Sequence, residues 1–286
     1  MQEKTIGVLY VVATPIGNLQ DMTLRAIEIL KTVDRIAAED TRHAAPLLKH
    51  YAISKPVLSM HEFNERERLK LILECLQSGE SVALISDAGT PLISDPGYHL
   101  VREAKANGVK VVAIPGPCAA IAALSVAGLP TDKFTFEGFL PAKIEARRNK
   151  LSLLLHETRT MIFYEAPHRL LGCLQALCEV FGKDRRAVVA RELTKIHESV
   201  MMGTLPELIT RYEAHPGEQR GEIVILIEGI HEEASESKEV IPEEVLDILL
   251  EELPLKQAAT LASKITGARK NELYELALAK KNQEKS

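Results

Sequence analysis

The N-terminal part of the chain alternates short β-branched apolar runs with stretches whose apolar side chains recur every three to four positions. The runs predict strands at 8–13, 35–38, 56–59, 82–86 and 109–114. The intervening stretches predict helices at 24–32, 44–50, 65–77 and 98–106. Such alternation is typical of βαβ units and a mostly parallel sheet, which binds ligands beside the carboxyl ends of its strands. We therefore predict a first α/β domain over 1–117.

The pattern changes after this point. Strands are predicted at 134–139, 161–164, 187–191, 197–203 and 223–228, with helices at 143–158, 169–181 and 205–212. The strands at 187–191 and 197–203 leave no room for a helix between them, so we predict a mixed sheet in a second α/β domain over 118–230.

The C-terminal part has a different composition. Between 231 and 254 nine acidic residues accompany one lysine, and 231–240 is predicted to be a solvated acidic linker. After it, 241–286 is predicted to be helical. Small apolar residues at helical spacing and a break at Thr266-Gly267 are typical of a helix-turn-helix, although a hairpin that only docks or dimerises would have the same pattern.

Composition narrows the class of protein. Hydrophobic residues make up 46% and charged residues 26% of the 286, as in globular proteins. No apolar run is long enough for a transmembrane helix and no signal peptide is visible, which predicts a soluble, cytoplasmic protein that does not bind membranes. The four cysteines and nine histidines lack metal-ligand spacing, so no metal site is predicted.

The net charge of −5 argues at first against a nucleic-acid partner, but its distribution does not. The acidic segment at 231–254 carries a charge of −8, from one basic and nine acidic residues. Residues 1–230 are nearly neutral, with 27 basic and 28 acidic side chains, and the last 32 residues carry +4, from seven basic and three acidic residues. The segment 133–150 has a local excess of basic residues, so a structured RNA remains a permitted partner.

Three loops that follow predicted strands of the first domain are rich in Gly, Pro and Asp. They are Ala-Thr-Pro-Ile-Gly-Asn at 13–18, Ser-Asp-Ala-Gly-Thr-Pro-Leu-Ile-Ser-Asp-Pro-Gly at 86–97, and Pro-Gly-Pro-Cys-Ala-Ala at 115–120. Exposed backbone N–H groups together with Asp87 and Asp95 suit a zwitterionic ligand; a long connection built of Asx-turns is the alternative. Cys118 precedes a helix, and a packing or ligand contact is favoured over a nucleophile because no His or Lys is near it in sequence.

The second domain has charged clusters at predicted strand ends. Phe-Tyr-Glu-Ala-Pro-His-Arg covers 163–169, Arg-Glu-Leu-Thr-Lys covers 191–195 and Met-Gly-Thr-Leu covers 202–205. These charges would cluster if the strands are neighbours, or they could simply pair with one another in solvent.

Taken together, these motifs, with Ala-Glu-Asp-Thr-Arg at 38–42 and Glu-Gly-Phe-Leu-Pro at 137–141, closely resemble the ribosomal RNA methyltransferases of the tetrapyrrole methylase superfamily. The resemblance covers 6–229, and the tail resembles the helical extension of that family. It implies two α/β domains with S-adenosylmethionine in the cleft between them, a homodimer, and 2′-O-methylation of a cytidine in 16S rRNA of the small ribosomal subunit.

The resemblance also assigns residues. It implies cofactor contacts by Thr14, Pro15, Gly17, Asp87, Gly89, Thr90, Cys118, Ala119, Phe163, Tyr164, Gly203 and Thr204. The family often has Ser where Cys118 stands. The Cys118 thiol would replace the hydroxyl contact with a weaker contact or with none. The candidate general bases are Glu165, Asp95 and His168, with Glu165 ranked first because its strand end is expected to face the cleft. The expected RNA contacts are Arg42, Lys143, Arg147, Arg148, Arg169 and Lys195.

Two alternatives stay open. The superfamily also methylates carbon atoms of porphyrin precursors and a modified histidine on a translation factor. The Arg-Arg segment and the helical tail are expected for an RNA acceptor and unnecessary for a porphyrin. A non-catalytic nucleic-acid-binding protein would use the tail alone and would not bind S-adenosylmethionine.

Overall fold

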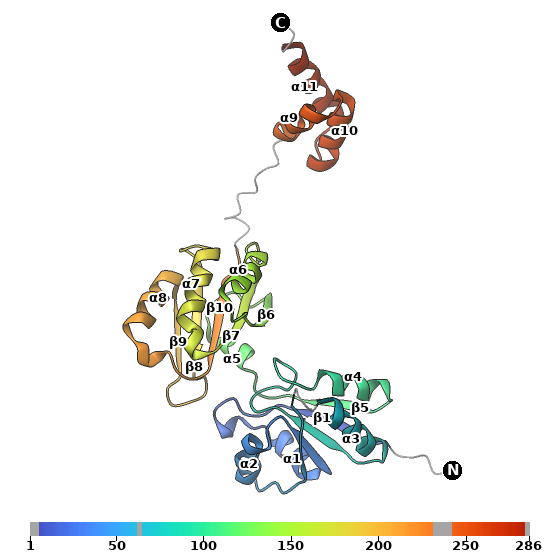
Figure 1. Cartoon of the computed structure of the whole chain (residues 1–286), viewed down its shortest axis with the longest axis vertical. Coiled ribbons are helices and arrows are strands. Elements are labelled where there is room, and N and C mark those ends of the chain that lie inside the picture. Colours follow the sequence, from blue (N-terminus) through green and yellow to red (C-terminus); the bar gives the residue numbers. More distant parts are fainter. Residues whose placement is uncertain (1–5, 62–64, 231–241, 284–286) are drawn as a thin grey trace, which may run out of the picture. The chain divides into compact units, whose positions relative to one another are not determined.

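The computed structural model of the chain describes residues 6–61, 65–230 and 242–283 (Figure 1). The chain divides into two compact units, Met1–Gly229 and Ile230–Ser286. Within the described ranges, no helix combines the length and the apolar character that crossing a membrane requires.

The first sheet of the larger unit is entirely parallel, with the strand order β3-β2-β4-β1-β5. Its strands are β1 (Val8–Val12), β2 (Arg35–Ala38), β3 (Val57–Ser59), β4 (Val82–Ile85) and β5 (Lys110–Ile114). Its helices are α1 (Leu24–Thr32), α2 (Thr41–His50), α3 (Glu65–Gln77) and α4 (Tyr98–Ala106). The predicted parallel sheet is confirmed, and every predicted element of this domain is present with small differences at its ends.

Helices cover both faces of this sheet. On one face α1 and α2 contribute Leu30 and Leu48 to an apolar cluster, and on the other α3 and α4 contribute Ile72 and Leu100. All four residues of β4 are buried, as expected for a central strand between two helical layers. The strand order places β1 between β4 and β5, so the loops that follow these three strands emerge side by side.

The second sheet is mixed, as predicted, with the order β6-β7-β10-β8-β9. Its strands are β6 (Phe134–Phe139), β7 (Thr160–Glu165), β8 (Arg186–Arg191), β9 (Ser199–Thr204) and β10 (Ile223–Ile227), and only β6 and β7 pair in parallel. One face packs on α6 (Ile144–Leu153), α7 (Leu170–Phe181) and α8 (Leu205–Ala214), and the other on α5 (Ala119–Val126). The helix predicted over 143–158 is shorter than expected and ends at Leu153.

The smaller unit contains α9 (Pro242–Glu252), α10 (Leu255–Thr266) and α11 (Lys270–Gln283). Leu246 of α9 packs with small residues of α10 and with Leu273 of α11. Gly267 ends α10 in the left-handed conformation, with φ +74°, at the break that the sequence predicts. The turn between two helices is thus confirmed, and α9 completes the core of this unit. The predicted linker at 231–240 lies outside the described residues.

Candidate active site

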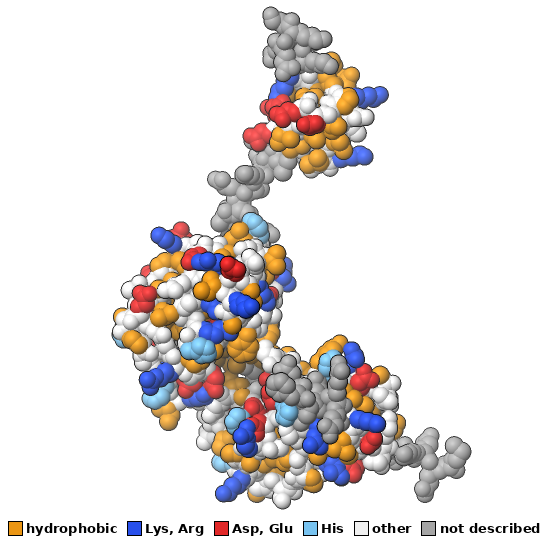
Figure 2. Space-filling view, in the orientation of Figure 1, with side chains coloured by type: hydrophobic (Ala, Val, Ile, Leu, Met, Phe, Trp, Pro, Cys, Tyr) orange, Lys and Arg blue, Asp and Glu red, His pale blue; other side chains and the backbone are white. Residues whose placement is uncertain are grey.

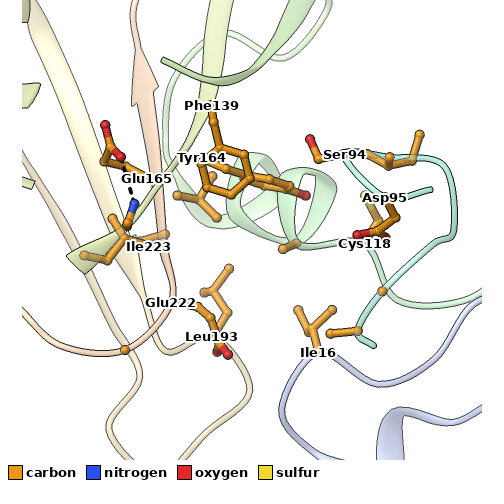
Figure 3. A pocket seen from close by; sticks show the side chains of 18 of the residues that line it. Ile16, Ser94, Asp95, Cys118, Phe139, Tyr164, Glu165, Leu193, Glu222 and Ile223 are labelled. Atoms are coloured by element: carbon orange, nitrogen blue, oxygen red, sulfur yellow. Dashed lines mark hydrogen bonds between the residues drawn. The ribbon is translucent and has the colours of Figure 1, made fainter. Parts of the chain in front are cut away.

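A cavity of about 400 Å³ opens between the loop ends of the first sheet and the second sheet (Figure 3). Its size falls within the usual range of small-molecule sites. Its lining comes from the three loops after β1, β4 and β5, from α5, and from the ends of strands β6, β7, β8 and β10. The lining residues are Ile16, Ala88, Gly89, Thr90, Ile93, Ser94, Asp95, Cys118, Ala119, Phe139, Tyr164, Glu165, Ala166, Pro167, Ala190, Leu193, Gly221, Glu222, Ile223 and Val224.

The three loops of the first domain are tied to one another by hydrogen bonds. The N–H of Thr14 donates to the carbonyl of Gly89 at 2.8 Å, and the N–H of Gly89 donates back at 3.0 Å. Thr90 Oγ1 donates to the carbonyl of Pro117 at 3.0 Å, which links the second loop to the third. Gly89 has φ +81°, a conformation that L side chains rarely adopt. These bonds hold the loop backbones together as one wall of the cavity.

The loop after β4 also carries backbone strain. Leu92 and Ser94 have φ values of +73° and +67°, and each such residue costs on the order of 1–3 kcal/mol. Both residues closely precede Asp95, which lines the cavity. The pKa of the Asp95 carboxyl is raised to about 6, chiefly by burial and to a smaller extent by the negative charge of Asp87, while a hydrogen bond from Ser86 acts in the opposite direction. Asp95 is therefore ionised at neutral pH and is a stronger base than an ordinary aspartate.

Asp87, although predicted as a cofactor contact, is exposed and lies outside the cavity lining. Its carboxylate accepts hydrogen bonds from the backbone N–H of Asp40 at 3.1 Å and is 2.7 Å from His43 Nδ1. This contact with Asp87 raises the pKa of His43. Burial, with the charges of Asp87 and Asp95, raises the pKa of Glu39. Acidic groups thus gather beside the cavity wall that carries Asp95.

Glu165 lies on the opposite side of the cavity from Asp95 (Figure 3). Its side chain has no exposed surface, and its Oε1 lies 3.0 Å from Arg169 Nε and accepts a hydrogen bond from the N–H of Ala166 at 2.8 Å. The carboxylate is thus neutralised by a neighbouring guanidinium. The third candidate base, His168, is exposed and is absent from the lining. Asp95 differs from both of these candidates. It lies in the cavity wall, and among the described residues no cation pairs with its carboxylate.

Tyr164 joins the second sheet to α5. Its phenolic oxygen accepts a hydrogen bond from the N–H of Ala120 at 3.2 Å. Burial raises the pKa of Tyr164 to about 12, with a smaller contribution from Cys118, so the phenol stays protonated. Cys118 precedes the first residue of α5 and lines the cavity. The N-terminus of α5 is thereby fixed beside the cavity, where its N–H groups favour an anionic ligand group.

The predicted cofactor contacts divide into two groups. The structure brings Gly89, Thr90, Cys118, Ala119 and Tyr164 together in the lining, and the backbone of Thr14 pairs with that of Gly89. Pro15 and Gly17 flank Ile16, which lines the cavity.

The remaining predicted contacts are placed elsewhere. The Phe163 side chain is fully buried in the cluster formed with α6, α7 and α8. Gly203 and Thr204 end β9, where Gly203 pairs with Ala187 near the start of β8, whereas the cavity is lined by Ala190 near its end.

Three predicted RNA contacts are engaged within the protein. Arg147 is 5% exposed and its Nε donates to the carbonyl of Pro141 at 3.2 Å. Arg169 pairs with Glu165 and donates to the carbonyl of Leu140. These guanidinium groups are structural in this fold, because the motifs that contain them pack inward.

Lys195 is similarly engaged, pairing with Glu192 at 2.8 Å and with Glu222. Arg42, Lys143 and Arg148 are exposed, although Arg42 pairs with Asp40 and Arg148 with Glu179. On the face seen in Figure 2, basic and acidic side chains are intermixed rather than gathered into one basic patch.

Sequence reasoning missed several residues of the cavity, among them Phe139, Ile93 and Leu193. Phe139 stands in the motif Glu-Gly-Phe-Leu-Pro, and its signal was an aromatic beside a glycine at a strand end. Within the described ranges, no three His, Cys, Asp or Glu side chains come together as metal ligands would.

Comparisons with known proteins identify the family of this chain. Residues 8–209 match the family of Tetrapyrrole (Corrin/Porphyrin) Methylases, and 237–281 match the RsmI C-terminal HTH domain. The chain is 56% identical to Ribosomal RNA small subunit methyltransferase I of Pseudomonas aeruginosa, over 95% of this chain and 97% of that protein. It is 50% identical to the protein of the same name in Escherichia coli O157:H7, over 95% of each.

Solved structures show the same fold at lower identity. The methyltransferase CobJ has a TM-score of 0.59 at 20% identity, covering 78% of this chain and 94% of that one. Diphthine synthase has a TM-score of 0.58 at 17% identity, covering 78% and 90%. On the near-full-length identity to the curated relatives and the two matching domains, the chain belongs to the tetrapyrrole methylases and, within them, to the ribosomal RNA small subunit methyltransferase I family.

Proposed function

We propose that this chain uses S-adenosylmethionine to methylate the ribose 2′-oxygen of a cytidine in 16S rRNA of the small ribosomal subunit. The observation that carries the proposal is the cavity between the two sheets, with Asp95 on one wall and the helix N-terminus at Cys118 beside it. The names of the near-full-length relatives support a ribosomal RNA substrate. The proposal of the 2′-oxygen and of cytidine rests on the resemblance of the sequence motifs.

The lining has the chemistry that S-adenosylmethionine requires. Ile16, Ala190 and Leu193 provide apolar surface for an adenine ring. The N–H groups at the start of α5 suit a carboxylate or ribose oxygens. Gly89 permits this turn of the loop because its φ of +81° is a conformation that L side chains rarely adopt. When bound, S-adenosylmethionine supplies a methyl group that its sulfonium makes electrophilic.

Asp95 is the residue that we propose as general base. With its pKa raised to about 6, the carboxylate is ionised at the pH of a cell and accepts a hydroxyl proton more readily than an ordinary aspartate. It would take the proton of the ribose 2′-hydroxyl onto a carboxylate oxygen while the ribose oxygen bonds to the methyl carbon. The bond between that carbon and the cofactor sulfur would break, and a neutral thioether would leave. Glu165 is less suited to this role because Arg169 and the N–H of Ala166 already hold its charge. Such a base contributes about 10²–10⁴-fold in rate.

Exposed cations are the candidates for holding the RNA backbone. We propose Arg42, Lys143 and Arg148 for this role, because their side chains reach solvent in the larger unit. In the smaller unit Lys256, Lys264 and Lys270 are exposed on α10 and α11 and form a second candidate surface. We also propose that the protein acts in the cytoplasm as a homodimer, an expectation that light scattering of the purified chain would test.

The test is transfer of labelled methyl groups to small ribosomal subunits that lack the modification. We expect label in 16S rRNA, recovered as 2′-O-methylcytidine after digestion to nucleosides, and a loss of about 10²–10⁴-fold in turnover for Asp95→Asn with unchanged cofactor affinity. Label on a base atom would contradict the choice of the 2′-oxygen. Absence of label from the RNA, with intact cofactor binding in calorimetry, would exclude ribosomal RNA in this particle as the acceptor.

A further inference from the structure

Phe139, at the end of β6, is 54% exposed although it forms part of the cavity wall. Figure 3 shows it beside Tyr164, across the cavity from Asp95. Exposed large apolar groups at a cavity mouth are typical of binding sites.

A bulge in β6 determines which way the ring points. The register of β6 against β7 shifts between Phe136 and Gly138. Phe136 pairs with Ile162, and Phe139 pairs with Tyr164. Because residues two apart on β7 share a face, both phenylalanines lie on the Tyr164 side, whereas a regular strand would place residues three apart on opposite faces. Their ring centroids lie 4.9 and 5.7 Å from that of Tyr164.

Three cations fix the backbone around this ring. The carbonyl groups of residues 137, 140 and 141 accept hydrogen bonds from Lys150, Arg169 and Arg147, respectively. Lys150 also pairs with the Glu137 carboxylate at 3.2 Å. The segment on either side of Phe139 is therefore held by charge-assisted bonds, which are stronger than neutral ones. The exposed ring is preorganised rather than left on a loose loop.

We infer that Phe139 is a stacking platform for the base of the acceptor nucleotide. The inference rests on the proposed function, since it concerns how that acceptor is held. Proteins that bind single-stranded RNA stack splayed-out bases on aromatic rings. A base on Phe139 would enter at the exposed mouth, while its ribose reaches inward toward Asp95 on the facing wall. The adenine of the cofactor is the other aromatic group that could meet this ring, and the experiment separates the two.

The experiment compares Phe139→Ala, Phe139→Leu and Phe139→Tyr with the wild-type chain. Methyl transfer to unmodified small subunits gives kcat/KM, and calorimetry gives the Kd of S-adenosylmethionine. We expect kcat/KM to fall roughly 5- to 100-fold for Phe139→Ala, from the usual value of one base–aromatic stack, with the cofactor Kd unchanged. Phe139→Tyr keeps an aromatic face and should retain most activity, whereas Phe139→Leu keeps apolar surface only and should resemble Phe139→Ala.

Phe134→Ala is the matched control. Phe134 is 40% exposed at the other end of β6 and is absent from the cavity lining, so its removal should leave kcat/KM unchanged. Wild-type activity in Phe139→Leu would overturn the inference, and so would a cofactor Kd that rises by the same factor as kcat/KM falls. If the wild-type chain labels 16S rRNA and Phe139→Ala does so equally well, the inference alone fails. If the wild-type chain leaves the RNA unlabelled, the proposed function fails and this inference fails with it.

Discussion

Replacing Asp95 by Asn should stabilise the protein at neutral pH while it slows methyl transfer about 10²–10⁴-fold. The fold holds this carboxyl in a partly buried position, where ionisation is unfavourable, and the charge of Asp87 adds to the cost. Asp95 must be ionised to act as a base, but its ionisation destabilises the fold. Such a conflict between stability and activity is typical of functional sites. Asn has nearly the same shape and carries no charge, so it removes the cost together with the function.

The size of the effect follows from the pKa. Raising the pKa of a carboxyl group from 3.8 to about 6 costs the ionised fold about 3 kcal/mol, at about 1.4 kcal/mol for each pKa unit. Partial exposure of Asp95 reduces this cost, so about 1–3 kcal/mol is expected. Between pH 4 and 6 the fold binds a proton that the unfolded chain has released, and the free energy of unfolding therefore falls as the pH rises through this window.

The assay is urea unfolding of both chains at several pH values. The variant should be more stable than the wild type by about 1–3 kcal/mol at pH 8 and by little at pH 4, where the folded wild type is protonated. Asp132→Asn, at an exposed carboxylate in the loop before β6, is the control and should change stability little at either pH. The reasoning is refuted if the gain from Asp95→Asn is the same at pH 4 and pH 8. In the wild type, turnover should fall as the pH drops below about 6.

Two further changes probe the walls of the cavity. Lys150→Met removes both contacts with Glu137, and we expect kcat/KM to fall by at least about twofold because the Phe139 segment loosens. Stability should change by no more than about 1 kcal/mol, since the pair is partly exposed. Lys183→Met, at an exposed lysine in the turn between α7 and β8, is the control, and equal activity of the two variants would contradict the role of Lys150. Gly17→Ala places a Cβ 2.6 Å from Lys195 Cγ, and thermal unfolding should show a loss of about 1–3 kcal/mol that shrinks in a Lys195→Ala background. A loss of equal size in both backgrounds would show that Lys195 is not the obstacle.

Much of the fold follows from sequence periodicity because its determinants are local. β-branched runs, helix-period stretches and Gly-rich turns specify the elements one at a time, and the short connection between β8 and β9 already requires an antiparallel pair. The loops after β1, β4 and β5 were also predictable as a binding edge, since the carboxyl ends of parallel strands share one edge. Asp95 and Cys118 were identified in this way.

The parts that sequence reasoning could not supply depend on which face a side chain takes. A bulge in β6 reverses the alternation after Phe136, so Phe139 joins the cavity although a regular strand would turn it away. Arg147 looks like a surface cation on a basic helix, yet it is buried, and its Nε donates a hydrogen bond to the carbonyl of Pro141, six residues earlier in the chain. The same guanidinium also lies close to α7, where a Cβ at Gly172 would be 3.6 Å from Arg147 Nη1. This neighbour is distant in sequence, and no local pattern reports it.

A substitution of Glu165 tests what determines the catalytic role of a carboxylate in this cavity. The determinant is either the cation that pairs with the carboxylate or the position of the carboxylate in the cavity wall. Its Oε1 is held by Arg169 and its Oε2 lacks a hydrogen-bond partner among the described residues. Glu165→Gln would leave the partly buried guanidinium of Arg169 facing a neutral amide, with an expected loss of stability of about 1–3 kcal/mol.

Arg169 also holds the backbone before Pro141 through the carbonyl of Leu140. We therefore expect turnover of Glu165→Gln to fall because the acceptor site is displaced, while the lower arm of the pH–rate profile stays unchanged. If instead that arm disappears in Glu165→Gln and survives in Asp95→Asn, Glu165 is the base and the assignment to Asp95 is wrong. Two carboxylates in one cavity, one neutralised by a cation and one kept basic by burial, are expected to divide their roles in this way.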